Sequence, residues 1–163
     1  MKQPALIIAL LLLLIGGLAL LHRNDQQARD TIRKHHLADI ERSLYFIRSL
    51  KGTYPPYTAA SWCGVLNDPQ NSGVKAQVEA ALRQQNEMYK NPAKPFPADP
   101  TFAGTAQDYF YVKRSPSVFE LYATLEADKT GDRNSRDCRT ADPVSFDYGI
   151  ASTTREDTIG APQ

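Results

Sequence analysis

The sequence predicts an α+β fold in which a long N-terminal helix, membrane-spanning in its first half, packs on a small antiparallel sheet of about three strands. Three observations predict it. An uncharged apolar run opens the chain, an amphipathic helical pattern follows it without a break, and segments rich in aromatic and β-branched residues come later. At 163 residues the chain has room for one compact domain and an anchor.

The apolar run extends from Pro4 to Leu21 and contains 18 residues without a charge. As a helix it is roughly 27 Å long, enough to cross the hydrocarbon core of a bilayer. A cleaved secretory signal is the competing interpretation, and Lys2 before an apolar run suits it. The run is long for a signal, however, and no small-x-small cleavage site closes it. We therefore expect residues 1–21 to be a retained transmembrane anchor.

The helical pattern continues beyond the anchor, and residues 22–52 are expected to form the stalk half of the same helix. An apolar stripe recurs there at steps of three to five residues, formed by Ala28, Ile32, Leu37, Ile40, Leu44 and Ile47. Charged residues fall mostly off the stripe, among them Arg29, Arg33, Asp39, Glu41, Arg42 and Arg48. Gly52, followed by two prolines, ends the helix.

Residues 53–154 are expected to form a globular head, and residues 155–163, which have no apolar pattern, a flexible tail. A turn-rich connection comes first, then a short helix with one apolar face made of Val74, Val78, Ala81 and Leu82. Three strands are predicted after it, at 108–113, 117–126 and 144–151, the last antiparallel to the second. In the second strand, one alternate set of side chains should face the stalk: Phe119, Leu121, Ala123 and Leu125.

Several motifs, in this order, resemble type IV pilins and type II secretion pseudopilins. They are the polar helix exit Ala28–Leu44 with the turn Gly52–Pro55, the segment Phe96–Pro100, the hairpin 108–126 and the segment Asp147–Ile150. The resemblance covers about two thirds of the chain. It implies a non-enzymatic structural subunit of an envelope apparatus for secretion, adhesion or DNA uptake. The implied partners are the membrane, other pilin-like subunits and their assembly machinery.

The start of the helix departs from the family pattern. Family precursors carry a glycine cleavage site and a glutamate in the first helical turn, whereas this chain reads Pro4-Ala5-Leu6-Ile7-Ile8. In filaments that glutamate neutralises a neighbouring subunit's amino terminus. A second function therefore stays open, a membrane-tethered extracytoplasmic binding module that uses a pilin-like fold without polymerising.

Charge and cysteine content point to opposite orientations of the chain. Arg23, Arg29, Arg33 and Lys34 follow the anchor while only Lys2 precedes it, so the positive-inside rule alone places the head in the cytoplasm. The two cysteines, Cys63 and Cys138, instead suggest a disulfide in an oxidising compartment, the alternative being two thiols in the cytosol. With the family resemblance, the disulfide favours a single-pass protein whose head lies outside the cytoplasm.

An acidic loop between the second and third strands contains the candidate metal ligands, Asp128, Asp132, Asn134 and Asp137. Several oxygen ligands in a glycine-containing loop suit calcium, and the corresponding loop of major pseudopilins binds it. Lysine and arginine side chains dilute the charge of the loop, and its spacing is not that of an EF-hand. A solvated turn without metal is therefore the interpretation that the residues favour, and calcium is the alternative.

No catalytic or cofactor-binding motif stands out. The three histidines, His22, His35 and His36, all lie on the stalk, where we expect them to be solvated. The head has no Ser-His-Asp set, phosphate-binding loop or dinucleotide fingerprint, so we expect no catalytic residues and no enzyme. The net charge of +1 gives no indication of nucleic-acid binding.

Overall fold

The computed structural model describes residues 3–90, 92, 94–105, 107–129, 133–134 and 145–152, and the side chains of 3–7, 9, 133–134 and 145 are outside that description. It has the mixed α+β fold that the sequence predicts. In chain order its elements are α1 (Gln3–Lys51), β1 (Trp62–Val65), the 3-10 helix η1 (Pro69–Asn71), α2 (Ser72–Met88), β2 (Phe110–Ser115), β3 (Val118–Ala123), β4 (Arg133–Asn134), β5 (Ser145–Phe146) and β6 (Tyr148–Ala151).

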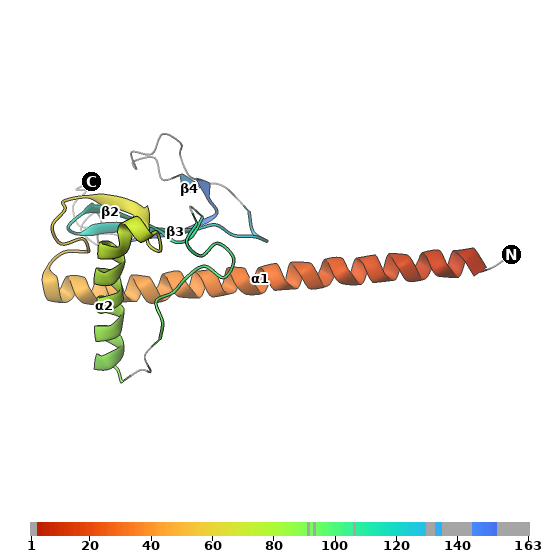
Figure 1. Cartoon of the computed structure of the whole chain (residues 1–163), viewed down its shortest axis with the longest axis horizontal. Coiled ribbons are helices and arrows are strands. Elements are labelled where there is room, and N and C mark those ends of the chain that lie inside the picture. Colours follow the sequence, from red (N-terminus) through yellow and green to blue (C-terminus); the bar gives the residue numbers. More distant parts are fainter. Residues whose placement is uncertain are drawn as a thin grey trace, which may run out of the picture.

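Helix α1 is continuous over 49 residues, as predicted. Its one proline, Pro4, lies in the first turn, where the missing N–H leaves no hydrogen bond unmade. At the other end Gly52 has a φ of 74° and its N–H donates to the carbonyl of Arg48 at 2.7 Å. That left-handed conformation suits glycine and ends the helix. Figure 1 shows the N-terminal half of α1 extending far beyond the rest of the described chain.

The sheet beside α1 has four antiparallel strands in the order β1-β2-β3-β6, so the expectation of about three strands was wrong by one. Strand β1 is the missed one, because its four residues, Trp-Cys-Gly-Val, lie within a segment that reads as turns. Gly64 is required there. A Cβ atom at this position would meet Asn71 Nδ2 at 2.8 Å, and that amide donates to the carbonyl of Val65.

The predicted last strand, 144–151, is split at Asp147. Strand β6 pairs antiparallel with β3, which confirms the predicted neighbour, whereas β5 pairs with β4 in a separate two-stranded sheet. The Asp147 side chain accepts a hydrogen bond from the Leu125 N–H at 2.8 Å, and its own N–H donates to Ala123. These local bonds replace ladder hydrogen bonds at the point where the chain changes sheet.

The core lies between α1 and one face of the four-stranded sheet. Its stripe residues Leu37, Ile40 and Leu44 pack with the buried side chains of Phe119, Leu121 and Ala123. This confirms the predicted packing of the stalk on the second strand of the hairpin. The stripe prediction was wrong at the edge of the head nearest the N-terminal half of α1. There Ala28 is exposed and Ile32 is 43% exposed.

Helix α2 crosses α1 beside the sheet (Figure 1). The predicted apolar face is confirmed, since Val74, Val78, Ala81 and Leu82 are buried. A side-chain hydrogen bond joins the two helices, from Ser43 Oγ to Gln85 Oε1 at 2.9 Å. The chain then returns from the far end of α2 to α1 through a proline-rich segment, and so reaches β2.

Candidate functional site

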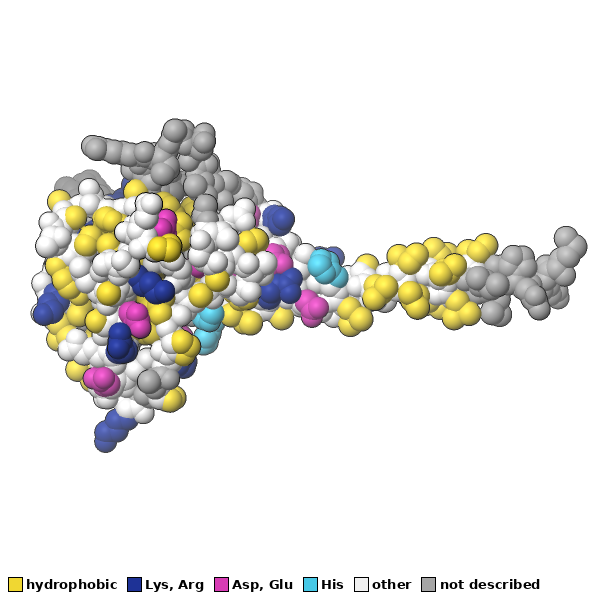
Figure 2. All heavy atoms as spheres, viewed as in Figure 1, with side chains coloured by type: hydrophobic (Ala, Val, Ile, Leu, Met, Phe, Trp, Pro, Cys, Tyr) yellow, Lys and Arg dark blue, Asp and Glu magenta, His cyan; other side chains and the backbone are white. Residues whose placement is uncertain are grey.

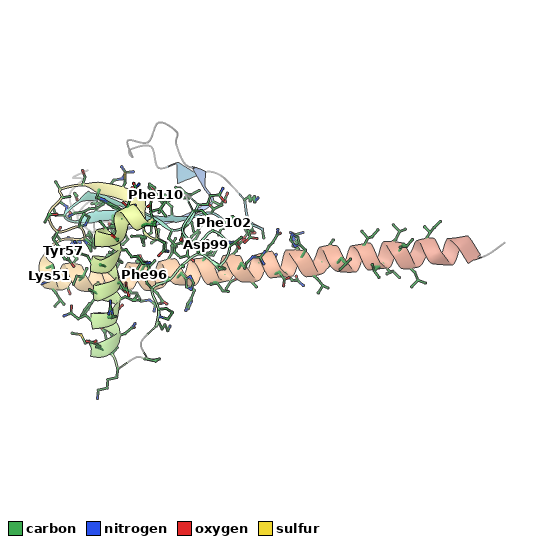
Figure 3. All side chains as sticks on the ribbon, viewed as in Figure 1. Lys51, Tyr57, Phe96, Asp99, Phe102 and Phe110 are labelled. Carbon is green, nitrogen blue, oxygen red and sulfur yellow. The ribbon has the colours of Figure 1, made fainter. Side chains whose placement is uncertain are left out.

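Charged side chains gather where the free half of α1 meets the head. We call this set the ionic collar, and it consists of Arg29, Asp30, Arg33, Asp99 and Glu126. The first three lie on α1, Asp99 ends the proline-rich segment, and Glu126 follows β3. The collar therefore ties α1 to two separate segments of the head (Figure 3 labels Asp99).

Arg33 is the centre of the collar and contacts three carboxylates. Its Nε and Nη2 bind both oxygens of Asp99, at 2.7 and 3.0 Å. Its Nη1 lies 2.7 Å from Asp30 Oδ1, and Nη2 also lies 2.6 Å from Glu126 Oε1. Its guanidinium lies over the ring of Phe102, 5.2 Å from the centroid. Arg33 is fully buried, so every charge-assisted bond it makes is to protein.

The remaining carboxylate oxygens of the collar are also satisfied. Asp30 accepts from the N–H groups of Glu126 and Ala127, each at 2.8 Å. Glu126 receives a bidentate contact from Arg29, at 2.9 and 2.6 Å. Asp99 caps the turn after it by accepting from the N–H groups of Thr101 and Phe102. A buried ionic group held this completely specifies one position of the helix along the head.

The collar shifts the pKa values of its own carboxyls. The pKa of Glu126 is lowered to about 2, chiefly by the hydrogen bond from Arg29 and also by those from Arg33 and Thr101, which together outweigh the opposing effect of burial. Burial alone would raise the pKa of Asp30, but the backbone N–H groups of Glu126 and Ala127 and the Arg33 guanidinium lower it. Both carboxyls are therefore charged at neutral pH and at moderate acidity.

Arg33 was predicted to lie off the apolar stripe, and this was wrong, because Arg33 is buried on the same face of the helix. Six buried positions of α1, namely 30, 33, 37, 40, 44 and 47, repeat with steps of three and four, and Ser43 beside them is buried as well. Asp30 and Arg33 thus continue the spacing of the apolar stripe toward the N-terminus. That spacing was the available signal. It was missed because a search for apolar residues skips a charged member of the same face.

The free half of α1 carries large apolar side chains that the described head does not cover. Ten of them, between Ile8 and Leu21, are 53–75% exposed. Figure 2 shows these side chains on all visible sides of the rod beyond the head. A polar stretch, residues 22–28, separates them from the collar, and we call it the neck. Soluble monomers rarely expose apolar surface this continuous.

A search of the described residues for a helix that is both long and apolar enough to cross a membrane finds none. The predicted anchor, 1–21, begins with residues that lie outside the description, and it stays a prediction.

The acidic loop is described only at its start. Asp128 is mostly exposed and its Oδ2 lies 3.4 Å from Lys34 Nζ. Asn134 belongs to β4, but its side chain lies outside the described residues, as do Asp132 and Asp137. Among the described residues no group of three or more acidic, histidine or cysteine side chains is placed to hold a metal. Calcium binding by this loop stays a prediction.

The predicted disulfide joins Cys63 to Cys138. Cys63 lies in β1 and is not a free thiol, which agrees with the prediction. Cys138 lies outside the described residues, so the pairing itself stays a prediction.

The histidines were expected to be solvated, and for His36 this was wrong. His22 and His35 are exposed, but His36 is half-buried and its Nδ1 lies 2.7 Å from the hydroxyl of Tyr109. Burial lowers the pKa of His36, and neighbouring Asp39 only partly offsets this.

No family model, curated protein or solved structure matches the chain.

Proposed function

We propose that this chain is a membrane-anchored, pilin-like structural subunit, in which the first half of α1 is the anchor and the ionic collar holds the head rigidly on it. The observation that carries the proposal is the change of surroundings along one unbroken helix. Its Leu37, Ile40 and Leu44 are buried under the sheet, while ten large apolar side chains before the neck are exposed. Lipid, or the apolar helices of other subunits, supplies the missing cover.

The neck has the length that this arrangement requires. Its seven residues, 22–28, rise by roughly 10 Å as a helix. The headgroup layer on each side of a bilayer is roughly 5–7 Å thick. A neck of this length crosses that layer and holds the head just above it. Because the helix is continuous and Arg33 clamps it at the head's lower edge, the head is expected to keep a fixed angle to the anchor.

The arrangement of elements supports a pilin-like fold in particular. A long helix whose C-terminal half lies on an antiparallel sheet is the architecture that the family resemblance implies. The head has no group that the proposal uses for catalysis. Other copies of the chain, or other subunits of the same kind, are the partners that would pack on the free half of α1.

A membrane-tethered binding module is the second candidate, favoured by the helix start Pro4–Ile8, which has neither the cleavage glycine nor the glutamate of filament subunits. Both candidates require the anchor and differ in whether the N-terminus is processed and whether copies associate. Mass spectrometry of the mature N-terminus, with cross-linking between copies in native membranes, distinguishes them. An intact N-terminus and no cross-linked copies would favour the tethered module.

The anchor is tested by two pairs of substitutions on the same helix. Changing Leu12 and Leu14 together to Asp places two charges in the proposed hydrocarbon region, at about 3 kcal/mol each on insertion scales. Changing Ile32 and Leu50 together to Asp places the same charges on exposed positions of the other half. Carbonate washing of membranes should release or deplete the first variant and retain the second. Equal retention of both variants would contradict the anchor.

A further inference from the structure

A cavity of about 820 Å³ lies between α1, α2 and the described residues of the proline-rich segment, 92 and 94–98. In Figure 1 that segment runs from the far end of α2 back to α1, and Figure 3 labels Phe96 within it. The volume falls within the ~300–1,000 Å³ typical of small-molecule pockets. The membrane proposal makes no use of this cavity.

One part of the cavity wall is apolar and firmly supported. It includes Leu82, which is buried in α2, and Phe96 and Pro97 from the proline-rich segment. The carbonyl of Pro97 accepts a hydrogen bond from Asn67 Nδ2 at 3.2 Å. Two residues further, Asp99 is held by Arg33 in the ionic collar. This wall is therefore fixed to the head and offers a preformed apolar surface.

Another part of the wall carries two cations that share one carboxylate. Arg42 Nη1 lies 3.4 Å from Asp39 Oδ1, and Lys94 Nζ lies 3.9 Å from Asp39 Oδ2. Both distances exceed those of a good charge-assisted hydrogen bond. The side chains of Arg42 and Lys94 are about 60% exposed, against 18% for Asp39. The two cations thus remain available to a second anion.

A polar side chain of α2 adds directional donors. Gln85 lines the cavity, and its Oε1 lies 2.9 Å from Ser43 Oγ, whose single proton it shares with the carbonyl of Asp39. Its amide NH₂ group is consequently the part that it offers to a ligand. An acceptor group on a ligand would meet this amide and the two cations, while an apolar body would contact Phe96 and Leu82.

We propose that this cavity binds an organic carboxylate that carries an apolar body. The carboxylate lies between Arg42 and Lys94, and the apolar body covers Phe96 and Leu82. Either a free aryl or alkyl acid or the C-terminal carboxylate of a peptide ending in an apolar residue has this chemistry. Binding of such a ligand is independent of the anchor and would give the head a role in recognition.

The test uses the full chain in non-ionic detergent and two matched probes, 3-phenylpropionate and its uncharged amide. NMR chemical shifts of the Gln85 and Asn86 side-chain amides, both at the cavity, report binding. The acid should shift both amides in a saturable way and bind at least roughly tenfold more tightly than the amide, because only the acid pairs with the cations. No saturable shift at millimolar acid, or equal affinity for acid and amide, would overturn the proposal.

Charge variants provide the second arm. Replacing Arg42 and Lys94 together by Gln should weaken binding of the acid at least roughly tenfold and leave the amide unaffected. The control Arg83→Gln makes the same change on an exposed arginine of α2 that pairs with Glu79. It should leave the acid's affinity unchanged. Undiminished binding by the double variant, or equal weakening by the control, would contradict the assigned site.

Two further probes identify the source of the carboxylate. N-acetyl-Ala-Ala-Phe with a free C-terminus is compared with 3-phenylpropionate at equal ionic strength. Tighter binding of the peptide identifies a peptide C-terminus as the ligand class, whereas tighter binding of the simple acid identifies a free organic acid. Binding of the peptide's C-terminal amide as tightly as the free peptide would contradict recognition of a carboxylate.

Discussion

The two halves of α1 carry leucine and isoleucine in quite different surroundings. In the free half the large apolar side chains are more than half exposed, whereas in the half under the sheet Leu37, Ile40 and Leu44 are completely buried. The buried half even includes a charged residue, Arg33, that is as inaccessible as the leucines. Burial along this helix is therefore decided by what lies beside each turn, and apolar character alone does not predict it.

One continuous helix thus lies in two different environments. The half on the head has its own partner in the sheet and uses charged groups to set its position. The free half has no described partner and is apolar on every side, so the proposal assigns lipid or other subunits to cover it. Between them, the neck is polar and the collar marks the border.

The largest effect is expected from a charge placed in the buried half. Ile40→Asp removes apolar contacts and buries an unpaired carboxylate, which should cost about 5 kcal/mol or more and prevent the head from folding. The control Glu41→Ala, at a half-buried position one residue further along, should cost under about 1 kcal/mol. Near-ultraviolet circular dichroism of the buried tyrosines, followed during urea unfolding, measures both. Equal stability of the two variants would show that the helix does not pack on the sheet.

A smaller but still large effect is expected at the collar. Arg33→Leu leaves Asp99 buried without its partner and should cost about 3–5 kcal/mol. Arg29→Gln removes the other arginine of Glu126, but Arg29 is partly exposed and Arg33 remains, so a much smaller loss of stability is expected. Urea midpoints of the two variants measure the contrast. A similar cost for both would mean that Arg33 is not the central group.

Acid should lower the stability of the head, because protonation acts on the ionic collar and on His36. The folded pKa of Glu126, about 2, lies below its unfolded value near ~4.3, so its stabilising contribution is complete above that value and is lost as pH falls toward 2. The lowered pKa of Asp30 acts with the same sign. For His36, burial favours the neutral ring, so its contribution is complete above ~6.5 and is lost below.

Melting temperatures measured from pH 8 to pH 2 should thus fall in two stages. Glu126→Gln should flatten the lower stage, and His36→Gln the upper one. Each variant serves as the control for the other. If neither substitution changes the pH profile of the melting temperature, Glu126 and His36 do not cause the loss of stability in acid.

The smallest effect on stability is expected at an exposed apolar side chain on the half of α1 that packs on the head. Ile32→Ser should change the free energy of unfolding by less than about 0.5 kcal/mol, because Ile32 lies on the outer side of the helix at the head's edge. Urea unfolding of this variant beside Leu37→Ser gives the comparison. A cost for Ile32→Ser close to that of Leu37→Ser would reveal a partner on this side of the helix.

Long periodic elements were predictable from sequence, and groups defined by long-range contacts were not. The full length of α1, the face of α2 and the pairing of β3 with β6 follow from periodicity and from the residues that end each element. Strand β1 has only four residues, and its pairing with β2 depends on a partner far along the chain. The collar was missed because Arg33 finds Asp99 and Glu126 only after folding, 66 and 93 residues away.

The most direct test measures whether lipid or water surrounds α1 at one position before the neck and at one position within it. Spin labels are attached to the full chain in lipid bilayers through Leu14→Cys or Gln27→Cys, with the unsubstituted protein as the background control. Electron paramagnetic resonance then compares relaxation by oxygen, which concentrates in lipid, with relaxation by a water-soluble nickel chelate. The account predicts high oxygen and low nickel access at position 14, and the reverse at position 27 in the neck. High nickel access at both positions would contradict the assignment of the free half of α1 to the membrane.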